Sequence, residues 1–541
     1  MPSQKQLNFV LRSLSLGLIL TACIFGLALI ARAQVSPSPT PSITPFASPL
    51  PTPTPTVPPI ELQPNNTQVP VGQTSSVFVN GAFGNVTIVI ANPAILGAAL
   101  DSSGQHLTIS GKAPGSTTVT ATDARGVSAM VAVRVAFLAG TIPSSVQVRL
   151  TGNPASPEFI REQVIAAVEH QLVLQPNAQV IISASDLAID HPLRQDDSLL
   201  TMLPVMLQGD AYFDAQGTVR VEVDNLAAPQ LPAHSLMISD FPERLLHDGV
   251  LFSSTLQARR PSRFLYFHYN PPGQIARRIV LRAVNTSAEP TLVQFIEGKD
   301  GPSPNEMAVG HTATKNFLVH LARGEGRVIQ IPGNGSVELV EQELTPGSIV
   351  CNLMQLRVIE GGRVNLTLFA QSLNADPNAL PSLLTQLDGT HAHARGVYPI
   401  PDFYYETSWS VDDPYLELPV GQIPLPNLSV GRALAGDYGV LQTFQVTIQN
   451  PSMQPQAIAI YENPRGGRAT GTYVIDGTLV QSHQVPPYSR YKIRQYIIPA
   501  RGFVRVSIQT IPEGGSSYPL RLIFAPDDGS VAPGAPGSPV Y

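Results

Sequence analysis

A proline-rich run near the N-terminus sets where this chain can begin to fold. Residues 36–59 contain ten prolines in 24 residues and no charged side chain. Proline lacks a backbone N–H and fixes φ near −65°, so such a run favours extended, polyproline-II-like conformations over a packed core. At about 3.1 Å per residue it would reach on the order of 70 Å. We predict that residues 34–59 are a linker and that the folded body begins near residue 60.

The residues before the linker have the pattern of an export signal. A short basic region (Lys5, Arg12) precedes the apolar residues 13–30, and Ala-Arg-Ala at 31–33 fits a cleavage site. Residues 20–23, Leu-Thr-Ala-Cys, resemble a bacterial lipobox that would lipidate Cys23, and an uncleaved segment would be long enough to anchor in a membrane. We favour cleavage, but each alternative places the body outside the cytoplasm, with membrane contact only through residues 1–33.

The composition of the remainder predicts a mainly β, multidomain protein. Charged residues are 13% of the chain, about half the usual share, whereas it has 52 prolines and 42 glycines. Short strands joined by turns fit this balance. The net charge of −6 and the lack of a basic block argue against a nucleic-acid partner. Only Cys351 remains after the export signal, so no internal disulfide is expected.

Residues 60–138 read as a small β-sandwich. Short strand-like runs separated by Gly, Asp and Asn turns are predicted at 67–71, 75–80, 86–91, 106–110, 117–122 and 128–135. The sequence GKAPGSTTVT at 111–120, followed by a turn at 123–126 and an alternating valine-rich strand, resembles bacterial Ig-like domains, including those that open some pilus-assembly secretins. The resemblance implies a spacer or adhesion module.

Residues 142–230 read as a small α/β module. A strand is predicted at 146–150, and Ser156, Pro157 and Glu158 then supply an N-cap, a first-turn proline and an acid at the positive helix end. Apolar residues recur at four-residue steps from Ile160 to Leu172, which predicts one buried helix face. His170 lies off that face and is expected to be solvated. Further strands are predicted at 179–183 and 218–223.

An internal repeat divides the C-terminal part into two predicted β-sandwiches, 231–375 and 392–527, followed by a disordered tail at 528–541. Asn-x-Ser-x-x-Pro occurs at 285–290 and at 450–455, each time between two strand-like runs and seven residues before a glutamate. Asn and Ser can bond to local backbone at a turn, and proline can open the return strand. Both copies also have a Gly-Gly pair before a final apolar strand, at 361–362 and 514–515. We interpret these features as a duplication.

This region also resembles an uncharacterised segment of secreted bacterial proteins that often carry a copper-amine-oxidase-type stalk domain. The matching sequences are SDFPE at 239–243, FHYN at 267–270, GPSP at 301–304, VGH at 309–311, ARGVYP at 394–399, DYGV at 437–440 and NPRGG at 463–467. The resemblance implies no activity. The stalk domain and an oxidase cofactor triplet are both missing, so no cofactor is predicted.

Two histidines form the one candidate metal site in the sequence. In an extended chain His391 and His393 would point the same way, and Asp388 or Asp402 could complete a set of zinc-type ligands. The pair lies in a Gly/Thr/Ala-rich connector, however, and nothing fixes a third ligand. We therefore expect an exposed linker and no metal.

An aromatic cluster is the candidate binding surface. Residues 403–415 contain Phe403, Tyr404, Tyr405, Tyr415 and the only tryptophan, Trp409. Aromatic rings beside acids and hydroxyls bind sugars or peptides with little loss of conformational entropy. Core packing at the start of the second sandwich is the alternative, and we favour it. A buried strand is also expected at 264–269, where apolar residues do not alternate with polar ones.

The function expected from the sequence is non-enzymatic. No nucleophile elbow, HExxH or P-loop sequence occurs, and the S-x-x-K match at 489–492 lacks its companion motifs. We predict a secreted or surface-anchored bacterial envelope protein used for structure, adhesion or assembly, with a cell-envelope protein or surface glycan as partner. The alternative is a protein that binds glycan or peptidoglycan through residues 403–415, with or without hydrolysing it.

Overall fold

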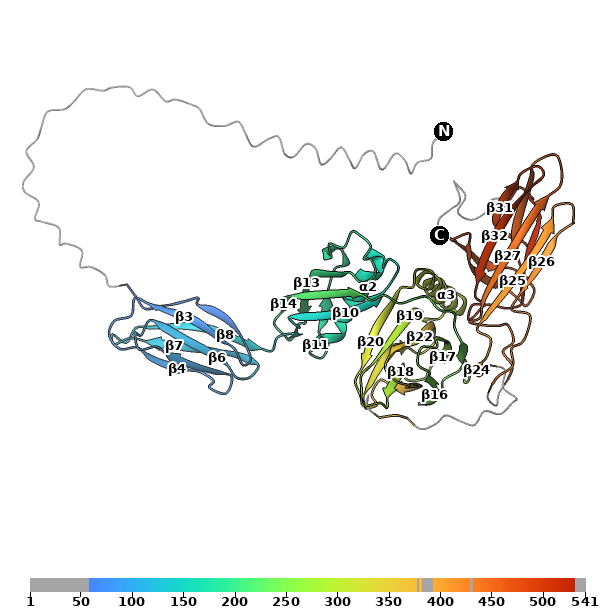
Figure 1. The fold of residues 1–541 in the computed structure, drawn as a ribbon. Helices are drawn as coiled ribbons and strands as arrows, with labels where there is room; N and C mark the ends of the chain where they lie inside the picture. The colour runs from blue at the N-terminus through green and yellow to red at the C-terminus, as the bar shows by residue number, and fades with distance from the viewer. Residues whose placement is uncertain (1–57, 377–378, 382–392, 429–431, 531–541) are drawn as a thin grey trace, which may run out of the picture. The chain divides into compact units, whose positions relative to one another are not determined.

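The computed structural model describes residues 58–376, 379–381, 393–428 and 432–530 (Figure 1). These residues form many strands and two α-helices, which confirms the mainly β, multidomain fold class. Neither helix in the described ranges is both long and apolar enough to cross a bilayer. The predicted export signal with Cys23, nearly all of the linker and most of the tail lie outside the described residues.

The first module is a β-sandwich of two four-stranded sheets, ordered β1-β3-β6-β5 and β2-β8-β7-β4. Its strands are β1 (Glu61–Gln63), β2 (Asn66–Pro70), β3 (Thr74–Asn80), β4 (Thr87–Ile90), β5 (Leu96–Leu100), β6 (His106–Gly111), β7 (Gly115–Thr122) and β8 (Ser128–Ala136). The sheets enclose alternating side chains such as Val77, Leu107 and Val131. All six predicted strands are present, and β1 and β5 are additional.

The α/β module follows. Its elements are β9 (Gly140–Thr141), β10 (Ser145–Thr151), α2 (Pro157–Gln171), β11 (Val173–Leu174), β12 (Gln179–Ile181), a 3-10 turn (Ala184–Asp186), β13 (Ser198–Gln208) and β14 (Ala215–Asn225). Ser156 caps α2 by accepting from the Phe159 N–H at 3.4 Å, as predicted. Ile160, Val164 and Val168 are buried and His170 is exposed. Strand β13 was not predicted, because Pro204 interrupts its apolar run.

The sheet of this module continues into the first C-terminal sandwich. The order β12-β13-β14-β10-β20-β19-β22-β17-β15-β24 forms one ten-stranded sheet. The junction is short, since only Leu150 and Thr151 of β10 pair with β20. The Thr151 hydroxyl donates to the Gly324 carbonyl at 2.8 Å. The predicted boundary near residue 230 is therefore crossed by a shared sheet.

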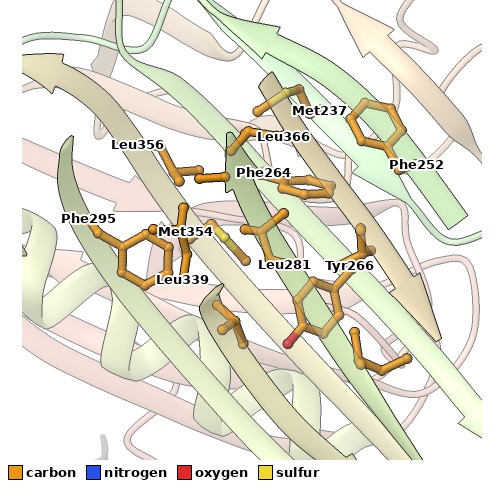
Figure 2. Close-up of a cluster of buried hydrophobic side chains, with 14 of the residues drawn as sticks. Met237, Phe252, Phe264, Tyr266, Leu281, Phe295, Leu339, Met354, Leu356 and Leu366 are labelled. Atoms are coloured by element: carbon orange, nitrogen blue, oxygen red, sulfur yellow. The ribbon is translucent and has the colours of Figure 1, made fainter. Parts of the chain in front are cut away.

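The first C-terminal sandwich packs that sheet against a second one, ordered β16-β23-β18-β21. Its strands are β15 (Ser235–Ser239), β16 (Gly249–Leu256), β17 (Ser262–Asn270), β18 (Arg277–Asn285), β19 (Thr291–Ser303), β20 (Gly326–Ile331), β21 (Ser336–Leu344), β22 (Ser348–Glu360) and β23 (Val364–Ser372). Figure 2 shows side chains of both sheets, among them Phe264, Leu281 and Met354, meeting in the core between them. As predicted, β17 is buried on both faces.

Helix α3 (Glu306–Arg323) is the largest element that the sequence analysis missed. Asn305 caps it by accepting from the Ala308 N–H at 3.2 Å, and Gly324 ends it in the left-handed conformation at φ 65°. It packs on the ten-stranded sheet above Gly298, where a Cβ would lie 2.2 Å from the Ala313 carbonyl oxygen. The helix therefore covers the face of β19 and β22 that the second sheet leaves open.

The second C-terminal sandwich has sheets ordered β25-β27-β32-β29-β30 and β26-β33-β28-β31. Its strands are β25 (Asp402–Ser410), β26 (Leu416–Val420), β27 (Leu441–Asn450), β28 (Gln456–Pro464), β29 (Ala469–Ile475), β30 (Thr478–Val485), β31 (Tyr491–Ile498), β32 (Gly502–Thr510) and β33 (Leu520–Pro526). Strand β24 (Arg395–Tyr398), which the sequence analysis assigned to this sandwich, pairs with β15 of the preceding one.

The repeated Asn-x-Ser-x-x-Pro turn has the same hydrogen bonds in both copies. The Asn285 amide donates to the Glu289 carbonyl at 2.8 Å, and the Asn450 amide donates to the Gln454 carbonyl at 2.8 Å. Each asparagine also bonds to the turn before the neighbouring strand of its sandwich, through Pro332 or Pro499. The Gly-Gly pairs are not equivalent, because the strand after the first, β23, pairs with β18, whereas the strand after the second, β33, pairs with β28.

Candidate functional site

Strand pairing at the end of the ten-stranded sheet brings Asp240 beside His393. Strand β15 ends at Ser239, and β24 runs antiparallel to it with Ser239 opposite Arg395. The Asp240 N–H continues this pairing by donating to the Ala394 carbonyl at 3.0 Å. Asp240, just after the end of β15, therefore lies close to His393, which stands just before the start of β24.

The imidazole of His393 bridges two carboxylates. Its Nδ1 lies 3.2 Å from Oδ2 of Asp240 and its Nε2 lies 2.8 Å from Oε2 of Glu243. The three side chains are partly exposed, His393 most of all at 42%. Both ring nitrogens face acceptors, which is the arrangement of an imidazolium that donates two charge-assisted hydrogen bonds. We call these three residues the acid–histidine triad.

Hydrogen bonding within the triad and burial shift each pKa in opposite directions. Hydrogen bonding raises the pKa of the histidine and lowers that of the two acids, whereas burial does the reverse. The hydrogen bond to Asp240, followed by that to Glu243, raises the pKa of His393 to about 10 against the effect of burial. Burial raises the pKa of Asp240 to about 6, although the hydrogen bond from His393 lowers it. The same kind of bond lowers the pKa of Glu243. At neutral pH the triad therefore carries a cation between two carboxylates.

A cavity of about 640 Å³ opens beside the triad, and aromatic side chains including Phe267, Tyr438 and Tyr518 form part of its wall. The rings of Tyr438 and Tyr518 meet edge to face at 5.7 Å. Beneath the triad, the buried His268 contacts the Ser239 hydroxyl through Nε2 at 3.2 Å and the Pro242 carbonyl through Nδ1 at 3.0 Å. Burial lowers the pKa of His268 to about 4, so a neutral ring holds the segment between Asp240 and Glu243.

The triad is also the one group of metal-ligand type among the described residues, with its ligand atoms within 4.8 Å of one another. A divalent cation such as Zn²⁺ binds neutral imidazole, so it would have to replace the proton that now bridges the carboxylates. His393 was predicted from the sequence as a candidate ligand, but Asp240 and Glu243 were not. Asp402 forms an ion pair with Arg263 at 2.8 Å, and His391 and Asp388 lie outside the described residues.

The predicted aromatic surface divides into a core residue and three exposed ones. Trp409 is 4% exposed and belongs to the core of the second C-terminal sandwich. Tyr404, Tyr405 and Tyr415 are 66%, 49% and 55% exposed. Tyr404 and Tyr405 belong to β25, at the edge of its sheet and parallel to β27. The predicted core packing applies to Trp409, whereas the tyrosines remain available as a binding surface.

A second polar cluster, wholly buried, joins helix α3 to the second C-terminal sandwich. Nδ1 of His311 lies 3.0 Å from Oε2 of Glu513, which is 0% exposed. The Thr472 hydroxyl donates to the other carboxylate oxygen at 2.6 Å, and Thr470 also donates to this carboxylate. The backbones approach closely beside this pair, since a Cβ on Gly310 would lie 1.7 Å from the Gly514 carbonyl oxygen.

The short sequences that carried the second resemblance lead to the cavity. Four of them supply residues of its lining, namely those at 239–243, 267–270, 394–399 and 437–440. A fifth, at 309–311, supplies His311 of the buried cluster. The first of these sequences, SDFPE at 239–243, contains both Asp240 and Glu243, so the set of short motifs is the sequence signal that could have pointed to them. Each motif alone is too short to indicate this.

Comparison with known proteins agrees with the N-terminal resemblance. Residues 63–136 match the family described as the pilus formation protein N-terminal region. This confirms the pilus-assembly type of the Ig-like module, and the match ends before the rest of the chain begins. No curated protein matches the sequence.

Several solved structures match parts of this chain at low similarity. Domains 1–6 of the surface-layer protein SbsC are 14% identical over 29% of this chain and 25% of that one, with a TM-score of 0.15. The glucan-utilisation protein SGBP-B of Bacteroides ovatus is 13% identical over 56% of this chain and 72% of its own, with a TM-score of 0.12. The tandem Ig repeats of Dlar are 10% identical over 31% and 98%, with a TM-score of 0.13. Such scores carry no functional argument.

Proposed function

We propose that this chain is an exported, non-enzymatic bacterial envelope protein that joins an extracytoplasmic assembly through its Ig-like module. The observation that carries the proposal is the match of residues 63–136 to the N-terminal region of pilus formation proteins. The export pattern at residues 1–33 and the proline-rich linker support the same location.

The Ig-like module presents an apolar row that suits contact with a protein partner. Val89, Thr120 and Met130 are neighbours across β4, β7 and β8. Val89 is 64% and Met130 58% exposed, so two large apolar side chains lie in register on the outer face of one sheet. Burying such a row on a partner would release water from apolar surface.

The contact between the two C-terminal sandwiches supports a structural role for this part of the chain. Helix α3 of the first sandwich contacts the second through the His311–Glu513 pair and the close approach of Gly310 to Gly514. A buried pair of this kind tolerates little relative movement, because separation leaves a charged group without its partner. We infer that this contact holds helix α3 against the second sandwich.

Deletion of residues 60–138 tests the proposal. We expect the full chain to migrate with a large envelope complex in native gels of detergent extracts. The deletion variant should still be exported and folded but should migrate alone. A second variant, Val89→Ser/Met130→Ser, keeps every module and should also lose its migration with the complex. Migration unchanged in both variants would contradict the proposal.

A second candidate function is binding of glycan or peptidoglycan, and the exposure of Tyr404, Tyr405 and Tyr415 favours it. Sedimentation with purified peptidoglycan, with Tyr404→Ala/Tyr405→Ala as the variant and Phe503→Ala as an exposed aromatic control, separates this function from assembly. Binding lost only in the tyrosine variant would support it, and no sedimentation of the full chain would exclude it.

A further inference from the structure

A cavity of about 420 Å³, distinct from that of the triad, lies where helix α3 covers the ten-stranded sheet. Its sheet side carries Arg263 of β17 and Gln355 and Arg357 of β22. Arg263 pairs with Gln355 across the two strands, and Arg357 lies two residues further along β22. Side chains two apart in a strand share a face, so both guanidinium groups belong to the same wall.

The charge of Arg263 is balanced within the protein. The side chain is 1% exposed, and its Nη1 lies 2.8 Å from Asp402. The same nitrogen donates to the Pro401 carbonyl at 2.7 Å, and Nη2 donates to Gln355 at 3.4 Å. Asp402 is the one carboxylate in the cavity lining, and Arg263 occupies it.

Arg357 has no such balance. The residue is 5% exposed, and its Nη1 donates a hydrogen bond to the Pro229 carbonyl at 2.7 Å. Its Nε is buried without a partner, and no carboxylate among the described residues forms an ion pair with it. Burial lowers the pKa of this guanidinium, but arginine still stays charged at physiological pH. The cavity lining therefore contains two guanidinium groups and one carboxylate, which pairs with Arg263.

The rest of the lining determines what kind of anion would fit. Leu318 and Leu321 of α3 line the cavity together with Leu441 and Val474. An inorganic ion beside the arginines would leave the space along this apolar wall unfilled. A carboxylate with an apolar body would fill both the space beside the arginines and the space beside the leucines. The carbonyls at the C-terminal end of α3, which would repel an anion, are taken up by the Gln230 amide at 3.2 and 3.3 Å.

We propose that this cavity binds a small organic carboxylate, with Arg357 contacting the carboxylate and the leucines of α3 contacting the apolar body. An uncompensated guanidinium matches a carboxylate in charge and in its planar, two-pronged geometry. The inference stands apart from the proposed assembly role, since none of these residues belongs to the Ig-like module.

Calorimetric titration of the full chain with hexanoate tests the inference, with methyl hexanoate and inorganic phosphate as the other probes. We expect one hexanoate per chain, no binding of the ester, and weaker binding of phosphate. Arg357→Met should weaken hexanoate binding about tenfold or more, because a hydrogen bond to a charged group is lost. It should also raise Tm, because a buried charge without a partner is removed. Arg220→Met, on the exposed face of β14, should change neither.

Absence of saturable hexanoate binding to the full chain would overturn the proposal, and so would equal binding by Arg357→Met or by the methyl ester. Tighter binding of phosphate would show an inorganic anion site and would also overturn it. Should Arg357→Met fail to unfold cooperatively, Leu321→Trp decides, since it fills the cavity and keeps the charge. Hexanoate binding retained by Leu321→Trp would contradict the assignment.

Discussion

Replacement of His393 by alanine removes the cation from between Asp240 and Glu243. The pKa of His393 rises from its ordinary 6.5 to about 10 in the folded protein. At about 1.36 kcal/mol for each tenfold change in proton affinity, this rise sets a ceiling of about 5 kcal/mol on the stabilisation. The side chain is 42% exposed, so water screens both pairs. With exposed pairs worth up to about 1 kcal/mol each, we expect a loss of about 1–2 kcal/mol at pH 7.

The pH dependence follows from the direction of each shift. A raised histidine pKa gives stability that is complete below 6.5 and is lost as the pH rises through about 10. The lowered pKa of Glu243 gives stability that is lost as the pH falls through its acidic range, and Asp240 takes up its proton near pH 6. The difference between wild type and His393→Ala should therefore be largest near pH 6 to 6.5, should fall steadily from there to about pH 10, and should also shrink below pH 6.

Urea unfolding across this pH range measures the difference, with His170→Ala as the control because His170 is an exposed histidine on α2. A His393→Ala curve that coincides with the control at every pH would refute the bridging imidazolium. A constant loss without pH dependence would show that His393 stabilises by packing alone.

The remaining predictions concern the metal, the buried cluster and the tryptophan. Because the imidazole already bridges two carboxylates, EDTA should shift Tm by less than about 1 °C, and stoichiometric Zn²⁺ that is lost in His393→Ala would contradict this. Glu513→Ala should cost about 3 kcal/mol or more in urea unfolding, since it removes the carboxylate that buried His311 and the buried Thr472 hydroxyl contact; a cost no larger than that of Glu406→Ala, at an exposed site, would refute the buried pair. Trp409, the only tryptophan, should show blue-shifted fluorescence that iodide does not quench, and Trp409→Ala should cost about 3 kcal/mol, against less than about 0.5 kcal/mol for Tyr404→Ala. Strong quenching by iodide would place Trp409 at the surface.

Local signals in the sequence predicted those elements that local chemistry determines. Ser156 and Pro157 start helix α2, and the repeated asparagine turns make the same backbone bonds at Asn285 and at Asn450. Helix α3 had comparable signals, with Asn305 at its start and Gly324 at its end. Gly310 lowers its helical propensity, and long apolar runs flank it. The β pattern of the surroundings therefore outweighed its caps.

The candidate site could be predicted only in part, because it depends on pairing between distant strands. Asp240 and His393 are 153 residues apart, and they meet only because β24 pairs with β15. The spacing of two histidines indicated His393, but the acids considered as a third ligand, Asp388 and Asp402, were both near it in the chain. Asp402, one of the two acids considered as that ligand, instead compensates the buried Arg263. The fold determines which buried charges pair with one another, and the spacing of residues along the sequence does not reveal these pairs.

Photo-crosslinking in intact cells tests the assembly role most directly. A photoreactive residue at Met130, which is 58% exposed on the Ig-like module, should form an adduct with another envelope protein. The same residue at Leu200, which is 55% exposed on β13, serves as the control and should form none. An adduct at Met130 alone is the result that the account predicts. No adduct at Met130, or an adduct only at Leu200, would contradict it.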